Sequence, residues 1–444
     1  MSSPRKALVI GFVAGAVGVT CALSLAAPRG SFRRLDLFAR VLSLVEQNYV
    51  EEVNEETLIQ GAVRGMMRTL DPHSSYLTPS EFAEVRADTD GEFGGVGVEV
   101  DDTRGGTLIV RRTLPDTPAA RAGILVGDLI VSVDGKPLVG GADDDPTTRL
   151  RGRPGTRVVV ELVRSGTDAA GQKEVRESIA MVREIIRVRA AEWSLLEPGI
   201  GHIRIRQFQE RTDAEVEEAL AALTRESKKP LAGLVLDLRD NPGGLFDQAV
   251  RVADLFLESG VIVATRGRGG RHLEQETARQ AGTHAAIPIV CLVNGDSASA
   301  AEILAGALQD HDRALVLGTR TFGKGSVQSL IPLEDGSGLK LTVARYFTPK
   351  GRVIQEHGID PDLVVEQIPA ADLEAARRSA ATEREEDLER HLAGDKPSAV
   401  AATPPSTTHT DYQLEMARQT LRAWHRFGQP PLRPAAQAQR EPAP

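Results

Sequence analysis

The pattern of apolar and polar positions divides the chain into four regions. Between residues 35 and 70, apolar side chains recur every three or four residues, the spacing of one face of a helix. Two such stripes are present, made of Phe38, Val41, Leu42 and Val45, and then of Leu58, Ala62, Met66 and Leu70. Asn54 stands just before the second stripe, where its side chain can cap a helix. The sequence therefore predicts an N-terminal helical segment over residues 31–81.

Between residues 82 and 187 the pattern becomes one of short strands and turns. Alternating apolar residues follow glycine-rich turns at Val98 and Leu129, and a further strand is expected over Val158–Val163. The run Pro118–Gly123 is typical of a short helix between strands. Short alternating strands joined by turns indicate a small β domain over residues 82–187.

Residues 188–369 alternate apolar strands with helices. Ile200–Ile205 and Leu234–Arg239 are predicted strands, and a helix is expected from Phe246 to Leu257. The sequence Thr212-Asp-Ala-Glu215 has the form of a capping box, which predicts the start of another helix. This alternation favours an α/β domain.

The alternation continues to the end of that domain. A buried strand over Ile287–Val293 is followed by a turn, a helix starting near Ser299, and a strand over Ala314–Leu317. The run Gly338–Phe347 alternates as a strand does. Its apolar face is expected to consist of Leu339, Leu341 and Val343.

From residue 370 on, the sequence predicts a linker, one helix and a tail. Residues 370–410 are charged and then rich in Ala, Pro and Thr, which is typical of a flexible linker. Helical spacing returns over residues 411–428, and a disordered tail is expected over residues 429–444. The expected fold class is multidomain α/β, with a strand-helix alternating core, an inserted β domain and an N-terminal helical segment.

The composition argues against nucleic-acid binding and against a cofactor. The 444 residues are 41% apolar and 26% charged, as in ordinary globular proteins, and a net charge of −9 gives no basic surface for nucleic acid. Cys21 and Cys291 are not expected to pair. No metal cluster and no nucleotide motif is recognisable, so no cofactor is predicted.

The first 30 residues predict export. Arg5 and Lys6 precede the uncharged segment Ala7–Ala27, which suits either a signal peptide or an uncleaved membrane anchor. Ser24-Leu25-Ala26 is an acceptable cleavage site. We expect the protein on the periplasmic side of the cell envelope, either anchored in the inner membrane or released after cleavage.

Ser299 stands in the position of a nucleophile. It lies between a buried strand and a helix N-terminus, where backbone N–H groups and the helix dipole can stabilise an oxyanion. Serine needs a neighbouring base, and Lys324 lies between two glycines that free the backbone to aim its side chain. To act as a base, its pKa must fall by roughly 3 from about 10.4. Gln328 could orient the amine. The alternative is a small-residue turn and a surface Gly-Lys-Gly loop.

These motifs resemble those of the C-terminal processing (tail-specific) serine peptidases. The family's Ser-Ala-Ser-Ala-Ser-Glu-Ile and Phe-Gly-Lys-Gly-Thr-Val-Gln blocks place its serine on Ser299, its lysine on Lys324 and its glutamine on Gln328. Two positions depart from the pattern. Asp296 adds a carboxylate that could oppose activation of the lysine, and Ala301 replaces the third serine.

The resemblance also implies an oxyanion hole. In the family an Asn-Pro-Gly-Gly turn supplies one of its amides, which corresponds to the backbone N–H of Gly243. The N–H of Ala300 would be its partner.

The β domain resembles a PDZ domain, a small β-sandwich. The run from Thr117 to Ile130 carries the resemblance, with Pro-Ala-Ala-Arg-Ala-Gly followed by Gly-Asp-Leu-Ile. A glycine-rich loop before an edge strand can bind a peptide's terminal carboxylate while the peptide adds as a strand. That loop would consist of Gly95, Val96, Gly97 and Val98.

The family resemblance implies a serine endopeptidase that uses a Ser-Lys dyad on envelope proteins after the PDZ domain has engaged a free substrate C-terminus. An activating or adaptor protein and a homodimer are possible partners, with membrane contact through an uncleaved N-terminal segment. Three alternatives stay open. They are a catalytically inactive PDZ adaptor, an enzyme activated by a partner, and a Ser-His-Asp hydrolase using His311.

Overall fold

The computed structural model describes residues 29–103, 107–138, 146–168, 171–368, 372 and 411–427. The chain forms two compact units, Met1–Leu77 with Leu330–Leu341, and Thr78–Ser329 with Thr342–Pro444. The predicted leader, the linker and the C-terminal tail lie almost wholly outside the described residues.

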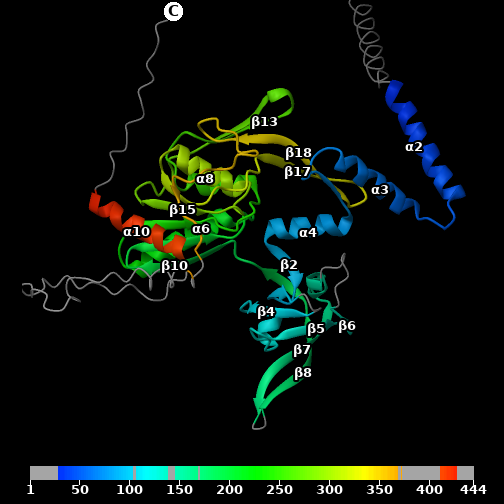
Figure 1. The fold of residues 1–444 in the computed structure, drawn as a ribbon, viewed down its shortest axis with the longest axis horizontal. Coiled ribbons are helices and arrows are strands. Elements are labelled where there is room, and N and C mark those ends of the chain that lie inside the picture. The colour runs from blue at the N-terminus through cyan, green and yellow to red at the C-terminus, as the bar shows by residue number, and fades with distance from the viewer. Residues whose placement is uncertain are drawn as a thin grey trace, which may run out of the picture. The chain divides into compact units, whose positions relative to one another are not determined.

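The described residues of the first unit form two helices and a short sheet (Figure 1). Helix α2 spans Arg29–Asn48 and helix α3 spans Glu55–Arg68. Asn54 caps α3 as predicted, because its side chain accepts a hydrogen bond from the Thr57 N–H at 3.2 Å. Strand β1, Ser75–Leu77, pairs antiparallel with the start of β18. Over the described residues, no helix has the length and apolar character needed to cross a membrane.

Helix α4, Pro79–Asp90, opens the second unit and was not predicted. Thr78 and Glu81 form a complete capping box at its start, and Gly91 ends it in the left-handed conformation. The helix buries none of its residues, so it lacks the apolar stripe by which helices are recognised. The β domain therefore begins ten residues later than residue 82, at strand β2, Glu92–Gly95.

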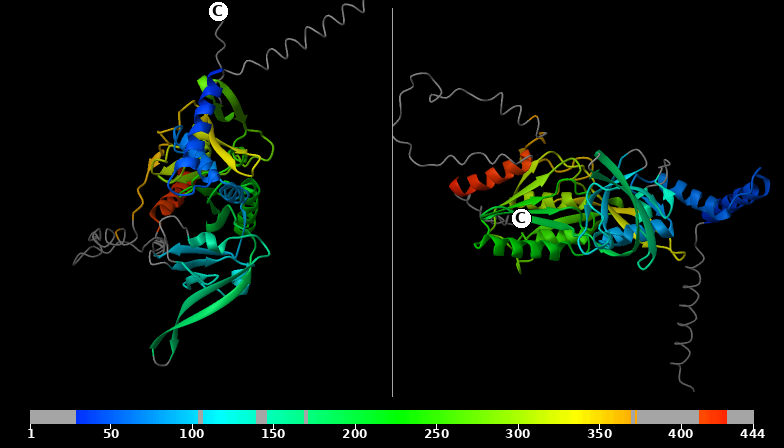
Figure 2. Two further views of the ribbon diagram at one scale, coloured as in Figure 1. Left: turned by 90° about the vertical axis from the view of Figure 1, so that its right-hand side faces the viewer. Right: turned by 90° about the horizontal axis from the view of Figure 1, so that it is seen from below.

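The β domain is built on one six-stranded sheet with the order β3-β4-β5-β7-β8 and β6 paired to β5. Strands β7 and β8 form a long hairpin (Figure 2). Strand β2 pairs separately with β9, and the short helix α5 packs on the domain core. The bounds are β3 Val98–Asp102, β4 Leu108–Thr113, α5 Pro118–Arg121, β5 Leu129–Val133, β6 Lys136–Pro137, η1 Pro146–Leu150, β7 Arg157–Asp168, β8 Gly171–Val182 and β9 Glu184–Arg187.

A second six-stranded sheet forms the centre of the α/β domain, in the order β10-β11-β12-β15-β16-β19. All neighbours run parallel except β10 and β11. Strand β11 has the predicted bounds Ile200–Ile205. The other strands are β10 Ala191–Glu197, β12 Gly233–Asp237, β15 Ile289–Val293, β16 Ala314–Gly318 and β19 Leu363–Val364.

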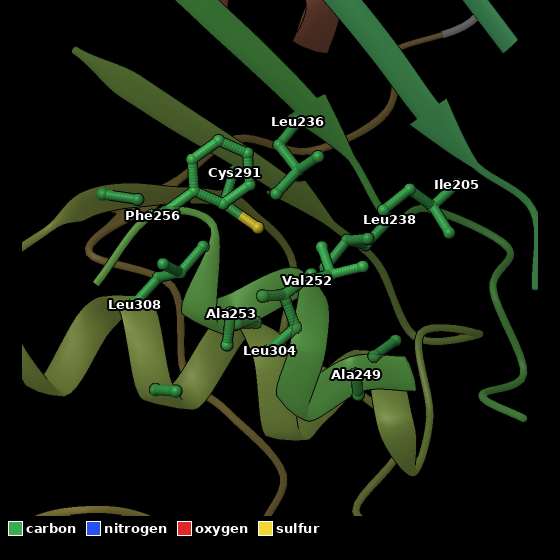
Figure 3. Close-up of a cluster of buried hydrophobic side chains, with 14 of the residues drawn as sticks. Ile205, Leu236, Leu238, Ala249, Val252, Ala253, Phe256, Cys291, Leu304 and Leu308 are labelled. Atoms are coloured by element: carbon green, nitrogen blue, oxygen red, sulfur yellow. The ribbon is translucent and has the colours of Figure 1, made fainter. Parts of the chain in front are cut away.

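Helices cover both faces of this sheet, which explains why its central strands are apolar throughout. Leu236 and Cys291 point to one face, where they meet α6, α7 and α8 in a core that Figure 3 shows in part. Val235 and Leu292 point to the other face, toward the C-terminal helix α10. The covering helices are α6 Thr212–Ser227, α7 Phe246–Asp254, α8 Ala300–Asp310 and α10 Tyr412–Phe427.

The predicted capping box at Thr212 is wrong. Thr212 is the first residue of α6, and its hydroxyl accepts from the Gln209 N–H at 2.8 Å instead of capping the helix. Glu215 accepts a hydrogen bond from the Ala191 N–H of strand β10 at 3.0 Å. The motif is present, but the preceding turn takes the side chain of Thr212 and a neighbouring strand takes that of Glu215.

A further sheet has the order β1-β18-β13-β14, with β17 paired to β18. The predicted apolar face of β18 is out of phase near the strand's end. Val343 is 41% exposed, whereas Ala344 and Tyr346 are buried. The strands are β13 Val261–Arg266, β14 His272–Thr277, β17 Ser326–Pro332 and β18 Gly338–Phe347.

Helix α10 is fastened by apolar contacts and by one buried charge cluster. Ala417 and Leu421 are fully buried against the sheet. At the start of the helix, both carboxylate oxygens of Asp411 accept from Arg239, at 2.9 and 2.7 Å. Arg239 also donates to Asp237 at the end of β12. The last described helix thereby contacts the turn that follows β12.

We expect Asp411→Asn to change how stability depends on pH. Burial alone would raise the pKa of Asp411, but the hydrogen bonds and charge of Arg239 outweigh burial and hold that pKa below 3.8. A carboxylate with a lowered folded-state pKa stabilises the fold above its unfolded pKa, and this contribution is lost as the pH falls. Urea unfolding between pH 7 and pH 3 should therefore show a shallower acid decline for Asp411→Asn, from a lower value at pH 7. The exposed Asp312→Asn is the control, and equal slopes for Asp411→Asn and wild type would contradict the expectation.

Candidate active site

Three turns meet where the parallel strands β12, β15 and β16 end, the edge at which open α/β sheets place their sites. Asn294, after β15, exchanges hydrogen bonds with Asp240, after β12. The Phe322 N–H, after β16, donates to the Ser297 carbonyl at 3.0 Å. The turns are therefore joined to one another by hydrogen bonds.

Ser299 directly precedes α8 and is 6% exposed. Its φ of 55° and ψ of −113° lie outside the favoured regions for a residue with a side chain. Such strain persists only where the surroundings enforce it, and it is commonest at functional sites. Among the described residues, the N–H of Ala300 at the helix start has no acceptor. The predicted position of the serine before a helix N-terminus is thus the observed one.

Glu302 joins the serine turn to the lysine loop. Its Oε2 accepts from the Ser299 N–H and the Lys324 N–H, each at 2.8 Å. Its Oε1 accepts from the Gly323 N–H at 2.7 Å and from the Thr321 hydroxyl at 2.6 Å. One fully buried carboxylate thus holds four donors from two segments.

The electrostatics of Glu302 combine two opposed effects. Burial is the larger effect and raises the pKa of this carboxyl above its usual range, while its hydrogen bonds to Thr321, Gly323, Ser299 and Lys324 oppose burial. All four partners donate hydrogen atoms, which is the arrangement that an ionised carboxylate requires. The residues of α8 that follow Glu302 are apolar or glycine as far as Leu308, so this charge has a specific structural role.

The lysine loop needs its glycines. Gly323 has a φ of +92°, and a Cβ on Gly325 would lie 2.4 Å from the Gln355 nitrogen. The Nε2 of Gln328 donates to the Ser326 hydroxyl at 2.8 Å and to the Thr342 hydroxyl at 3.4 Å. Orientation of Lys324 by Gln328 therefore stays a prediction.

Asp296 is the carboxylate that could oppose activation of the lysine. It is exposed to solvent, and its backbone N–H donates to the Asn294 side chain at 3.2 Å. Solvent screens an exposed charge, so its effect on a neighbouring amine is weakened.

The prediction for Gly243 needs a correction. Gly243 does lie against the nucleophile, since a Cβ there would be 2.8 Å from the Ser299 Cβ. Its N–H, however, donates to Oδ1 of Asn241 at 2.8 Å. Asn241 is fully buried, and its Nδ2 donates to the Ile205 carbonyl at 2.8 Å. The Gly243 amide is therefore occupied and is not available to an oxyanion in this structure.

Tyr346 is a residue of the site that the sequence reasoning missed. Its backbone N–H donates to the Gly325 carbonyl at 2.7 Å, and its ring stacks on Phe246 with the centroids 5.7 Å apart. Burial raises the pKa of Tyr346 to about 12, against a smaller lowering by the neighbouring Ser299 side chain, so the phenol stays protonated at neutral pH.

The predicted carboxylate loop of the β domain has a suitable backbone. The carbonyls of Val96 and Gly97 accept from the Ala119 and Leu114 N–H groups, each at 2.9 Å. The N–H groups of Val96 and Gly97 donate to no other residue in the part of the chain that the structure describes. Gly97 has a φ of +85°, and a Cβ there would be 2.3 Å from the Thr117 Cβ.

Local signals existed for some of the missed residues. Glu302 is a lone charge inside the apolar run of α8, and such a buried charge needs partners. Asn241 lies in the Asn-Pro-Gly-Gly turn, where a side-chain hydrogen bond to the backbone two residues on is common. The contact of Tyr346 with Ser299 spans 47 residues of sequence, and no local pattern reports it.

Comparison with known proteins identifies the family. Residues 199–365 match peptidase family S41, residues 109–164 match the PDZ domain, and residues 24–80 match the N-terminal domain of the activating protease CtpB. The carboxy-terminal-processing protease of Bartonella bacilliformis is 42% identical over 403 residues, which cover 89% of each chain. The carboxyl-terminal-processing protease of Synechocystis sp. is 37% identical over 333 residues, 73% of this chain and 75% of that one.

A solved structure, that of a photosystem II D1 C-terminal processing protease, is 33% identical and covers 74% of this chain and 92% of its own, with a TM-score of 0.44. The extent of the match to the curated relatives shows that this chain belongs to the carboxy-terminal-processing serine proteases of peptidase family S41. The recognition from the motifs is confirmed, and so are the α/β fold class and the embedded PDZ domain.

We expect Glu302→Gln to lower both activity and stability. Glutamine keeps one acceptor oxygen but turns an NH₂ group toward two N–H or O–H donors, each of which costs about 1–3 kcal/mol when left unsatisfied. The free energy of unfolding should fall by at least about 2 kcal/mol in urea titrations, and peptide cleavage should fall with it. Glu215→Gln is the matched control, since Glu215 accepts a single bond that glutamine can keep. Wild-type cleavage and stability in Glu302→Gln would refute this role.

Proposed function

We propose that the protein is a serine endopeptidase with a Ser-Lys dyad, which cuts polypeptides after its PDZ domain has bound their free C-terminus. Ser299 attacks the scissile carbonyl, and its proton passes to the neutral amine of Lys324. The protonated amine then returns that proton to the departing amine, and water releases the acyl-enzyme. The Ala300 N–H binds the oxyanion, and Gln328 orients Lys324.

The observation that carries this proposal is the shared oxygen of Glu302. Because the N–H groups of Ser299 and Lys324 both lie 2.8 Å from that one atom, the two residues belong to one rigid constellation. The strained backbone of Ser299 supports a functional role for this residue. Fixed placement of nucleophile and base is what dyad catalysis requires.

Recognition of substrate tails rests on the loop Gly95–Val98. The N–H groups of Val96 and Gly97 have no acceptor among the described residues, and they lie beside an edge strand. Such free donors can bind a terminal carboxylate. We expect the substrate peptide to add to the sheet as a strand next to β3, with its C-terminal side chain in an apolar groove.

A Ser-His-Asp mechanism has no support at His311. This residue follows the end of α8, which rises about 1.5 Å per residue away from Ser299. Its Nε2 lies 2.7 Å from the Val261 carbonyl. A hydrogen bond on β13 therefore accounts for the histidine.

An enzyme that awaits activation is the second candidate, favoured by the occupied Gly243 amide and by the match of residues 24–80 to the N-terminal domain of an activating protease. Under this alternative, a partner or the PDZ domain would shift the site into its active arrangement. Location on the periplasmic side, leader cleavage and homodimerisation stay predictions from the sequence.

Cleavage of an unstructured test protein ending in Leu-Ala-Ala should require both dyad residues. We expect Ser299→Ala and Lys324→Ala to lose at least about 1000-fold in rate, because members of a catalytic unit fail together. Since only the neutral amine is a base, wild-type activity should rise with pH through one apparent pKa below about 10.4. Initial rates between pH 6 and pH 10 measure this.

Lys350→Ala changes an exposed lysine outside the dyad and is the control for charge removal. Full activity in Lys324→Ala would exclude the Ser-Lys mechanism. Binding of the tail without cleavage by wild type would favour the adaptor or the partner-activated enzyme.

The PDZ proposal predicts that amidation of the substrate C-terminus raises KM. Loss of a charge-assisted contact of about 1.5–3 kcal/mol corresponds to at least a tenfold rise, with little change in kcat if the domain only tethers. Gly97→Ala should abolish the difference between free and amidated tails, because its Cβ would displace the loop from Thr117.

Gly123→Ala also places alanine at a positive φ, of +77°, but with open space around the Cβ, and serves as the matched control. Equal KM values for free and amidated tails with the wild-type enzyme would argue against carboxylate recognition.

A further inference from the structure

Two like charges stand side by side on strands β13 and β18. Arg266 and Arg345 are directly opposite each other where the two strands pair antiparallel. Directly opposed side chains on a sheet lie close together, and like charges in such a pair are destabilising. Neither arginine forms an ion pair with a carboxylate in the part of the chain that the structure describes. The fold thus holds two positive charges together without a protein anion to balance them.

This pair lies on the solvent side of the sheet. One residue away along each strand, Thr265 and Tyr346 also oppose each other, and both are buried. Side chains alternate between the two faces of a strand, so Arg266 and Arg345 point away from the core. Arg345 is exposed, and the half-buried Arg266 lies over the ring of Phe347, with its guanidinium carbon 4.2 Å from the ring centroid. A ligand can therefore reach this pair from solvent.

The guanidinium of Arg266 is not committed to a protein acceptor. Its Nε is buried and donates to no acceptor among the described residues. A ligand would therefore displace no protein partner here, and an anion beside the two guanidinium groups would offset the repulsion between them. Guanidinium groups bind phosphate and carboxylate oxygens through paired N–H donors. The chemistry of the pair thus suits an oxyanion.

The turn that follows β13 extends the positive charge (Figure 1). Arg268 and Arg271 are exposed in this turn and form no ion pair with a described carboxylate. Between them, Gly269 and Gly270 have φ values of 72° and 76°, a conformation that residues with side chains rarely adopt. We call this surface the basic face, and it consists of Arg266, Arg268, Arg271 and Arg345.

We propose that the basic face docks on the phosphate headgroups of an anionic lipid surface. Its charges are spread over two strands and a turn, which suits many phosphates in a plane better than one enclosed anion. Exposed apolar side chains accompany them, Val343 two residues before Arg345 and Leu273 after the turn. Basic side chains beside apolar ones suit the headgroup region of a bilayer. Because the whole chain has a net charge of −9, the attraction comes from this local cluster. The inference does not depend on the role of Ser299.

An acidic peptide suits this surface less well. A peptide most readily adds to a sheet at an edge strand, and β14 is the edge strand here. Glu274 and Glu276 belong to that strand and would repel an acidic peptide. Arg266 itself lies on β13, which is paired on both sides. The arrangement therefore favours headgroups over an acidic protein segment.

Vesicle binding by the full chain tests the inference. Wild type and the double variant Arg266→Gln/Arg345→Gln are titrated with phosphatidylcholine vesicles that contain or lack phosphatidylglycerol. The quantity compared is the ratio of the two partition coefficients. An arginine near an anionic surface contributes about fivefold, so the ratio should fall about 25-fold in the double variant. Higher salt should lower the wild-type ratio toward that of the variant.

The double variant Arg176→Gln/Arg225→Gln is the matched control. It removes the same charge from two exposed arginines outside the basic face. Its ratio should match that of wild type, and circular dichroism shows that each variant is folded. An equal fall in both double variants would reduce the effect to net charge and overturn the role of the basic face.

A fluorescent probe on Leu273→Cys reports contact at the basic face itself. This second measurement is needed because residues 7–27 could bind vesicles on their own, in wild type and variants alike. Cys291 is fully buried and Cys21→Ser removes the other thiol, so only the new cysteine is labelled. The emission should shift to the blue with phosphatidylglycerol vesicles and not with phosphatidylcholine alone.

An unchanged ratio in Arg266→Gln/Arg345→Gln, or a probe that does not respond to phosphatidylglycerol, would overturn the proposal. Inorganic phosphate and a polyglutamate peptide are titrated in the same way. If wild type binds one of them and the double variant does not, while the vesicles have no effect, the basic face belongs to a free anion or to an acidic protein instead.

Discussion

The active-site edge of this protein depends on the buried carboxylate of Glu302. Taking a carboxylate out of water is costly, and here four donors from two separate segments offset that cost. Removing any one segment would leave the charge under-solvated. The same interaction therefore stabilises the fold and determines the spacing of Ser299 and Lys324. A change that disturbs the spacing of these two residues is expected to destabilise the fold as well.

The turn after β12 is also held in place from the opposite face of the sheet. Helices α6, α7 and α8 bury one set of side chains and α10 buries the alternate set, so each central strand is held from both sides. At the end of β12, Arg239 connects Asp237 to Asp411 on α10. The turn bearing Asn241 and Gly243 thus starts from a residue that is anchored on the face away from α8. Rigid turns on a doubly covered sheet are a common basis for catalytic geometry.

Local patterns predicted much of this architecture. The strand Ile200–Ile205, the cap at Asn54 and the serine before α8 follow from periodicity and turn chemistry, and the structure has them as expected. Helix α4 was missed because it has no apolar stripe. The phase of β18 was wrong because burial there is decided by contacts with distant elements. The same reason applies to the site. Motifs pointed to Ser299 and Lys324, but the contacts of Glu302 with the lysine loop and of Tyr346 with Phe246 are set by tertiary structure.

The place of α10 in the chain has a consequence for the order of assembly. Arg239 lies near the middle of the sequence and is buried, yet one of its two carboxylate partners arrives only with the last described helix. During synthesis, the sheet can form while that guanidinium still lacks Asp411. The turn after β12 gains this support only once α10 has been synthesised. A protease assembled in this way completes its own site after all of its other described elements have emerged from the ribosome.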